Sequence, residues 1–479
     1  MKTNLKLFFA GGILNFAFAP FYVVVIAFFS FPYLYKKLAA AKSGKQAFWH
    51  GWWFGFGHFV FGLYWISNSL LVDLRFAWLI PFAVSLIPSA AAIFIGLVCY
   101  VFYKSKHKSI FLFASLWVLA EIARSYFPFG GFPWNLIGYS ALFSNYFAQI
   151  ASIGGVYLAS FIIIIISLSI TSNKTWWLLI LIPAIFIFGY VRVQPTEYTT
   201  TKVRIVQPNI AQTLKWDPAL LNLNFFDTLA LAAGSDADII VLPESAVPYH
   251  INRKPEVAAK IASVLKEGAF IVAGSSRSED GYKIWNSLFL LDSKGEIQDY
   301  YDKHHLVPFG EYVPLRQFLP IEKITPGMID FTAGTQGKII TSAKYKFLPL
   351  ICYEVIFPNY AQINSKMGEY DFIVNTTNDG WFGNSTGPQQ HLSMTIMRAI
   401  EQGKPVLRAA NTGVSAIIDP YGRVLASAPY NKVEAIDGFI PAKLSAKTTY
   451  SSMGLMAVLL TITLSLALSI VFRALRVKK

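Results

Sequence analysis

Three polar residues that could act together in one reaction each follow an apolar run. Glu244 ends IIVLPE, Cys352 ends LPLIC, and Lys303 lies in YYDKHHLVPFGE. A cysteine becomes an effective nucleophile when a base removes its proton and a positive charge stabilises the thiolate. A glutamate and a lysine supply these two functions. Each residue alone also fits a plainer role, a buried small side chain or a surface charge, so the chemistry requires all three to lie together.

Between residues 195 and 450, the sequence predicts alternating strands and helices, and these elements would position the three residues. Strand-like runs begin at Val203, Asp238, Ala269, Ser287, Phe347 and Asp371, and two more cover 414–419 and 423–426. Helical stretches at 255–267 and 391–402 lie between some of them. This order predicts an α/β domain with strands buried on one or both faces. Because such sheets collect their sites at the carboxyl ends of the strands, Glu244, Lys303 and Cys352 can converge.

The composition indicates that this domain is attached to a membrane part. Of 479 residues, 54% are hydrophobic and 14% are charged, against about 25% charged in soluble proteins. This excludes a soluble single-domain protein and a disordered chain. Two cysteines, Cys99 and Cys352, are too few for a disulfide framework or an iron–sulfur cluster. His304 and His305 lack further ligands at zinc spacing, and no phosphate-binding glycine loop is present, so neither a metal nor a cofactor is predicted.

The chain has eight apolar segments, most of them with lengths near the 17–25 residues that span a bilayer. They cover 8–20, 21–35, 49–71, 76–103, 110–127, 150–171, 175–192 and 453–472. They predict a helical membrane domain of seven spans at 1–194, the α/β domain at 195–450, and a last transmembrane helix with a basic tail at 451–479. Segments one and two are short and share Pro20, which also fits a re-entrant hairpin. A cleaved signal peptide ending at Ala19 is the competing interpretation.

The net charge of +14 lies at the ends of these segments. The flanking basic residues are Lys2, Lys6, Lys36, Lys37, Lys42, Lys45, Lys104, Lys106, Lys108, Lys174, Arg473, Arg476, Lys478 and Lys479. Without these 14, the chain holds 27 basic and 27 acidic residues. The excess charge therefore indicates membrane topology and not nucleic-acid binding. The positive-inside rule places both termini in the cytoplasm and the α/β domain on the opposite side.

Five further residues have two explanations each. Glu121 and Arg124 lie in the fifth apolar segment, where charge is costly. Either they form a structural ion pair with each other or they contact a lipid headgroup. The aromatic residues Trp216, Trp381 and Phe382 are either lids and membrane contacts or ordinary packing.

The three strings together resemble the motifs of the nitrilase superfamily of carbon–nitrogen hydrolases, which use a Glu, Lys and Cys triad in an αββα sandwich. LPES, YDKHHLVPFGE and ICYE carry the match, and Glu311 corresponds to a second glutamate found in many members. Supporting strings are QTLKWDP, NDGWFG, GPQQH, RAANTG and GGFPWNLIGYS. With its apolar segments, nearly the whole chain resembles the membrane-bound lipoprotein N-acyltransferase branch of that superfamily.

This resemblance implies a ping-pong acyl transfer. Glu244, with a pKa raised by burial, would remove the Cys352 proton, and the thiolate would attack a phospholipid ester to give a thioester and a lysophospholipid. Lys303 and the backbone N–H of Tyr353 would stabilise the oxyanion. The acyl chain would then pass to the α-amino group of the diacylglyceryl cysteine of an apolipoprotein. Glu311 would hold Lys303 or the incoming amine.

The remaining implications concern supporting residues, location and partners. Tyr353 and Glu354 either shape the site or only pack, and Trp216 is a further supporting residue. The resemblance implies a multi-pass monomer in the bacterial inner membrane, a periplasmic catalytic domain, no cofactor, and a phospholipid donor. Two alternatives stay open, a membrane-tethered amidase that hydrolyses a small amide and a scaffold that binds lipoproteins without chemistry. The amidase differs from the acyltransferase in the fate of the acyl-enzyme, because an acyltransferase must exclude water and admit an amine. Loss of binding, rather than loss of turnover, in Cys352→Ala would favour the scaffold.

Overall fold

The structure is a computed structural model that describes residues 2–105, 108–279, 282–318, 322–325, 327, 329–335 and 337–477, without the side chains of 365 and 468–477. Of the basic residues named above, Lys106, Lys478 and Lys479 lie outside the described residues. The chain forms two compact units. The first comprises Met1–Ser67, Ala77–Gln194 and Thr448–Lys479, and the second comprises Asn68–Phe76 and Pro195–Lys447.

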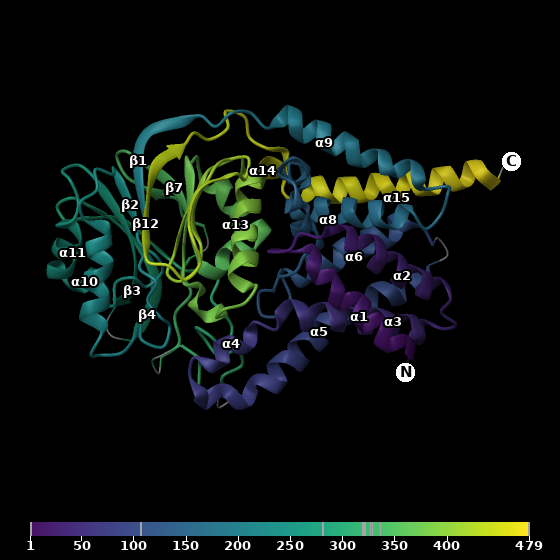
Figure 1. The fold of residues 1–479 in the computed structure, drawn as a ribbon, viewed down its shortest axis with the longest axis horizontal. Coiled ribbons are helices and arrows are strands. Elements are labelled where there is room, and N and C mark those ends of the chain that lie inside the picture. The colour runs from purple at the N-terminus through teal and green to yellow at the C-terminus, as the bar shows by residue number, and fades with distance from the viewer. Residues whose placement is uncertain are drawn as a thin grey trace. The chain divides into compact units, whose positions relative to one another are not determined.

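The first unit is built from helices (Figure 1). Its main helices are α1 (Lys2–Ile13), α2 (Ala27–Ala39), α3 (Gly44–Leu63), α5 (Ile80–Lys104), α6 (Ile110–Arg124), α8 (Ala151–Ser169), α9 (Leu181–Arg192) and α15 (Leu455–Val477). Within the described residues, two helical stretches are long and apolar enough to cross a membrane, Leu74–Lys104 and Ala151–Ser169. Shorter apolar helices cover Trp176–Arg192 and Leu455–Ala467. The eight predicted spans therefore stay a prediction.

Glycines set the distance between α1 and α3. A Cβ atom on Gly57 would lie 1.9 Å from the carbonyl oxygen of Phe8, and one on Gly11 would lie 1.9 Å from the carbonyl oxygen of Phe54. Neither position has room for any side chain. The backbones of the two helices therefore touch directly, as small residues permit in membrane helix pairs.

The second unit contains two six-stranded sheets. In the first, the order is β12 (Glu434–Pro441), β1 (Tyr198–Gln207), β2 (Ile239–Val241), β3 (Phe270–Glu279), β4 (Lys283–Asp292) and β5 (Ile297–Asp302). In the second, the order is β11 (Val424–Ala428), β10 (Ser415–Ile418), β9 (Val406–Ala410), β8 (Phe372–Thr377), β7 (Lys346–Ile351) and β6 (Ile340–Thr341). Strands β1, β2 and β3 run parallel, as do β7, β8 and β9.

The sheets face each other across one core, and helices cover their outer faces. Val203 and Val241 point from the first sheet into the cluster that also holds Phe347 and Val374 of the second. Val206 points the opposite way, toward α10 (Leu221–Ala232) and α11 (Pro255–Ala262), because successive side chains of a strand alternate between faces. Helices α12 (Pro358–Asn364) and α13 (Gly387–Gln402) pack on the second sheet, and Figure 1 shows α13 beside it. The predicted nitrilase-type α/β domain is confirmed.

Every predicted strand overlaps an observed one, but four strands were missed. Of these, β5, β6 and β12 lie at sheet edges, where polar residues interrupt the apolar pattern, as in IQDYYD. The fourth, β9, is central, and Arg408 breaks its apolar run. Helix α11 ends at Ala262 instead of 267.

Candidate active site

The three predicted residues follow three strands of the second unit. Glu244 lies in the turn after β2, Lys303 directly follows β5, and Cys352 directly follows β7. Their exposed fractions are 7%, 1% and 8%. The Nζ atom of Lys303 lies 3.5 Å from Oε1 of Glu244, and both charges act on the Cys352 thiol. The fold thus brings together residues from two different sheets.

Lys303 is held by more than one carboxylate. Its Nζ atom lies 2.9 Å from Oε2 of Glu311, and its backbone N–H donates to the carbonyl of Asn286. The Asn286 amide donates to Oε1 of both Glu244 and Glu311, at 2.8 Å each. Burial alone would lower the pKa of Lys303, but Glu311 and Glu244 outweigh it and raise that pKa. The lysine therefore stays charged. Asn286, on β4, was missed because its only signal was a polar residue inside an apolar run.

Cys352 occupies a turn with unusual backbone geometry. Its φ angle is +49°, in the left-handed region that residues with a Cβ rarely adopt. Burial raises the pKa of its thiol to about 12, and Glu244 acts in the same direction while Lys303 opposes both. The resting cysteine is therefore a neutral thiol. It needs a base to become nucleophilic, and Glu244 is the carboxylate that acts on it most strongly.

Glu354 joins the lysine segment to the cysteine turn. Its Oε1 atom accepts hydrogen bonds from the Tyr301 hydroxyl at 2.6 Å and from the backbone N–H groups of His304 and His305 at 2.9 and 3.1 Å. Its Oε2 atom accepts from the backbone N–H of Ile351 at 2.8 Å. The carboxylate is fully buried, and burial raises its pKa. It therefore fixes the two segments that carry Lys303 and Cys352.

The other two predicted supporting residues lie near the site in different ways. Tyr353 is half-buried and packs edge-to-face on Phe357, with ring centroids 5.0 Å apart. Trp216 is 37% exposed. Its neighbour Lys215 is only 5% exposed and donates from Nζ to the backbone carbonyl of Glu244 at 2.9 Å. The pattern QTLKWDP singled out the tryptophan, and nothing in it indicated a buried lysine.

A second buried charged cluster, which includes Asp379, also acts on the cysteine. Asp379 accepts from Arg408 at 2.7 Å and from the Thr377 hydroxyl at 3.0 Å, and it lies 2.8 Å from Nδ1 of His391. Asp379 and Cys352 interact electrostatically, and Thr377 hydrogen-bonds to the thiol. The contacts of His391 with Asp379 and Arg408 are those of a structural hydrogen-bonding group.

The NDGWFG loop, which carries Asp379, is held by residues of the segment 68–76. Asn68 donates from Nδ2 to the carbonyl of Phe382 at 2.7 Å, and Ser69 donates from Oγ to the carbonyl of Trp381 at 2.9 Å. These contacts lie within the second unit. They show that the backbone of the NDGWFG loop is fixed by a piece of chain far from it in sequence.

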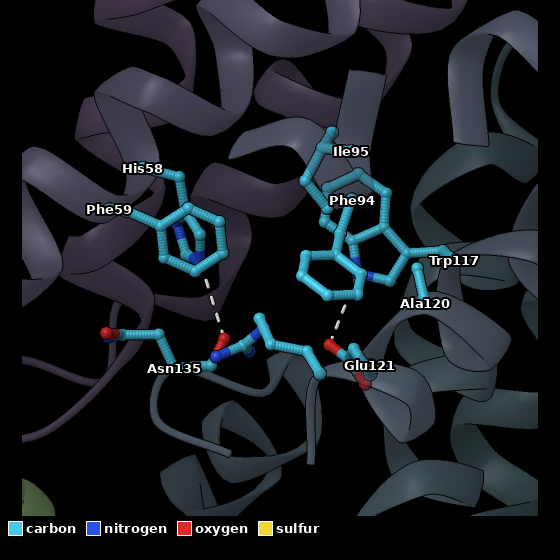
Figure 2. A pocket seen from close by; sticks show the side chains of 9 residues that line it. His58, Phe59, Phe94, Ile95, Trp117, Ala120, Glu121 and Asn135 are labelled. Atoms are coloured by element: carbon cyan, nitrogen blue, oxygen red, sulfur yellow. Dashed lines mark hydrogen bonds between the residues drawn. The ribbon is translucent and has the colours of Figure 1, made fainter. Parts of the chain in front are cut away.

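In the first unit, Glu121 and Arg124 have separate partners. Oε1 of Glu121 accepts from Trp117 Nε1 at 3.2 Å and from the backbone N–H of Ile137 at 2.8 Å. Arg124 donates to the carbonyl of Phe132 at 2.5 Å. Figure 2 shows Glu121 and Trp117 together at a small internal pocket. In the described part of the chain, no ion pair joins Glu121 to Arg124, so the expected mutual pair is absent.

Comparison with known proteins covers both units. Residues 202–449 match the carbon–nitrogen hydrolase model, and residues 10–169 match the model of the apolipoprotein N-acyltransferase N-terminal domain. The apolipoprotein N-acyltransferase of Rickettsia prowazekii is 38% identical over 96% of each chain. The chain belongs to the apolipoprotein N-acyltransferase family. The predicted resemblance is thereby confirmed.

Other relatives of this family extend the match. The apolipoprotein N-acyltransferase of Brucella melitensis is 36% identical over 92% of this chain and 90% of its own. Among solved structures, a carbon–nitrogen hydrolase superfamily protein from Xanthomonas campestris, XC1258, is 20% identical, with a TM-score of 0.37 over 50% of this chain and 90% of its own. Identity of the family therefore rests on sequence and not on this structural similarity.

Proposed function

We propose that this protein transfers an acyl chain from a membrane phospholipid, through a thioester on Cys352, to the α-amino group of the diacylglyceryl cysteine of apolipoproteins. Family membership supports the N-acyltransferase activity and the lipoprotein acceptor. One observation carries the assignment of the site. A neutral thiol, a carboxylate and a permanently charged lysine lie buried together at the ends of three strands.

In the first half-reaction, Glu244 accepts the proton of the Cys352 thiol, and the thiolate attacks the ester carbonyl. The oxyanion of the tetrahedral intermediate is stabilised by Lys303 Nζ and by the backbone N–H of Tyr353. When the C–O bond breaks, Glu244 returns the proton to the leaving lysophospholipid oxygen. The product is the Cys352 thioester.

In the second half-reaction, the acceptor amine, after losing its ammonium proton, attacks the thioester. Glu244 takes a proton from the attacking nitrogen, the C–S bond breaks, and the proton passes to the sulfur of Cys352. An amide and a free thiol result. Glu311 and Asn286 keep Lys303 aligned throughout, because both contact the lysine segment directly.

The lipid nature of the proposed substrates explains why the enzyme would be attached to a membrane. Each carries acyl chains, and withdrawing tens of CH2 groups from a bilayer costs about 0.8 kcal/mol per group. The proposed arrangement has seven spans at 1–194 and one at 451–479, with both termini in the cytoplasm. The catalytic domain at 195–450 then lies in the periplasm, and the enzyme acts as a monomer in the inner membrane.

The proposal is tested by intact mass measurement. Purified full-length protein in detergent is incubated with phosphatidylethanolamine and no acceptor, beside Cys352→Ser. A mass gain of one acyl chain that hydroxylamine removes, absent from the variant, supports the thioester. No adduct together with no lysophospholipid would overturn the proposed mechanism.

A further inference from the structure

The site contains a second buried lysine that the proposed steps leave unused. Lys215 lies between β1 and α10 and is 5% exposed. Its Nζ atom donates to the backbone carbonyl of Glu244 at 2.9 Å. The titratable groups that act on it are Glu244 and Cys352. It therefore faces the base and the nucleophile.

The charges of the site explain what this lysine adds. Direct contacts join one ammonium group, Lys303, to two carboxylates, Glu244 and Glu311. This cluster alone has an excess negative charge, which disfavours a thiolate at Cys352. A protonated Lys215 balances that excess. Lys303 cannot balance this excess alone, because its single positive charge already interacts with both Glu311 and Glu244.

We propose that Lys215 is a positioning residue for the acyl transfer, holding the Glu244 turn through its carbonyl and supplying the positive charge that favours the Cys352 thiolate. The inference rests on the proposed function for the role of Cys352. It concerns the ease of forming the thiolate and not the identity of the acyl donor.

Lys215 also differs from Lys303 in its response to pH. Burial lowers the pKa of Lys215 to about 8, although Glu244 and Cys352 oppose that shift. Lys303 stays charged over the whole range because its pKa is raised. The positive charge of Lys215 is therefore present below about pH 8 and is lost as the pH rises above it.

The chain offers a matched control in Lys404. It is 8% exposed, and its Nζ atom donates to the backbone carbonyl of Tyr370 at 2.9 Å. Burial also lowers its pKa to about 8. The charged groups that act on it are Lys443, Glu369, Asp371 and Lys447, and none belongs to the site. Its replacement reproduces the loss of a buried lysine without affecting the cysteine.

The experiment measures alkylation of Cys352 by iodoacetamide in the purified full-length protein, followed by peptide mass spectrometry, for wild type, Lys215→Met, Lys215→Arg and Lys404→Met. At pH 7 we expect Lys215→Met to react about tenfold more slowly than wild type, a change of about one pKa unit in the thiol. Lys215→Arg should restore most of the rate, and Lys404→Met should match wild type. Equal rates for wild type and Lys215→Met would overturn the inference.

The pH profile separates charge from structure. The ratio of wild-type to Lys215→Met rates should fall toward one between pH 7 and 9.5, because wild type itself loses the charge. Above pH 8 the rate of Lys215→Arg should rise more steeply than that of wild type, since arginine stays charged. This comparison needs no methionine variant, so it holds even where that variant fails to fold. Parallel profiles for wild type and arginine would contradict the inference.

Failure of this inference is distinguishable from failure of the proposed function. Alkylation requires no lipid, so it reports the thiol whether or not a thioester forms. A wild-type thioester with no effect of Lys215→Met on alkylation would overturn only the role of Lys215. Absence of the thioester, with the alkylation differences intact, would overturn the phospholipid reaction and leave the charge effect standing.

Discussion

Lys303 Nζ lies 2.9 Å from Oε2 of Glu311. This is shorter than its 3.5 Å separation from Oε1 of Glu244. The lysine is thus anchored mainly by a carboxylate that has no part in the proposed proton transfers. Glu244 consequently keeps the weaker contact, which leaves its oxygen available for the thiol proton.

Replacing Glu311 by Gln should slow formation of the acyl-enzyme by about 100-fold, a loss of about 2.7 kcal/mol of transition-state stabilisation. The variant removes the anchor of Lys303 while it keeps the size of the side chain. The rate of hydroxylamine-sensitive mass gain measures the effect. Exposed Glu279→Gln, also paired with a cation, is the control, and an unchanged rate for Glu311→Gln would show that the anchor is dispensable.

Glu354→Gln should destabilise the second unit. The carboxylate accepts hydrogen bonds from four donors, and an amide would turn its NH2 group toward at least one of them. A buried donor left unsatisfied costs about 1–3 kcal/mol, so we expect an apparent Tm lower by about 5 °C. Tryptophan fluorescence on heating measures it. A variant with the wild-type Tm would mean that the carboxylate does not fix these segments.

Asp379→Asn should cost about 3–5 kcal/mol, because Arg408 is left buried without its counter-charge. Burial would raise the pKa of Asp379, but Arg408 and His391 outweigh it and lower that pKa to about 2. A lowered folded-state pKa contributes stability that is complete above about pH 4 and is lost as the pH falls toward 2. The Tm difference from wild type should therefore be constant from pH 5 to 8. Exposed Asp236→Asn is the control, and a difference that varies within that window would contradict the assignment.

Gly57→Ala should destabilise the helical unit, because the new Cβ would meet the Phe8 carbonyl oxygen at 1.9 Å. Backbone cannot move aside without separating α1 from α3. Gly12→Ala is the matched control, since the three atoms nearest its Cβ would all belong to the ring of Phe61, a side chain that is 45% exposed. Thermal aggregation in detergent should begin several degrees lower for Gly57→Ala than for Gly12→Ala. The same onset for both would show that the helices are not in close contact.

Most of the central strands, and the positions of Glu244 and Cys352 at strand ends, were predictable because their signals are local; β9 is the exception. An apolar run that ends in a polar residue marks the end of a buried strand, and the runs before Glu244 and Cys352 have that pattern. Lys303 follows β5, whose sequence IQDYYD lacks such a run. Parallel strands place those ends at one edge. The roles of these residues in catalysis stay a prediction.

Other parts of the site could not be predicted because they depend on contacts across the fold. Lys215 looks like any surface lysine until its loop packs beneath Glu244. Asn286 reaches two carboxylates 42 and 25 residues away along the chain. The edge strands β5 and β12 were missed for the same reason, since pairing with a neighbour and not local hydrophobicity defines them.

The segment Asn68–Phe76 belongs to the second unit although 118 residues, Ala77 to Gln194, separate it from the rest of that unit. During synthesis it therefore leaves the ribosome long before the loop whose carbonyls it will bind. Until residues 381 and 382 are synthesised, the side chains of Asn68 and Ser69 cannot form their hydrogen bonds to those two carbonyl groups. A fragment starting at residue 195 would lack this piece permanently, so the second unit cannot be excised as one continuous stretch of polypeptide.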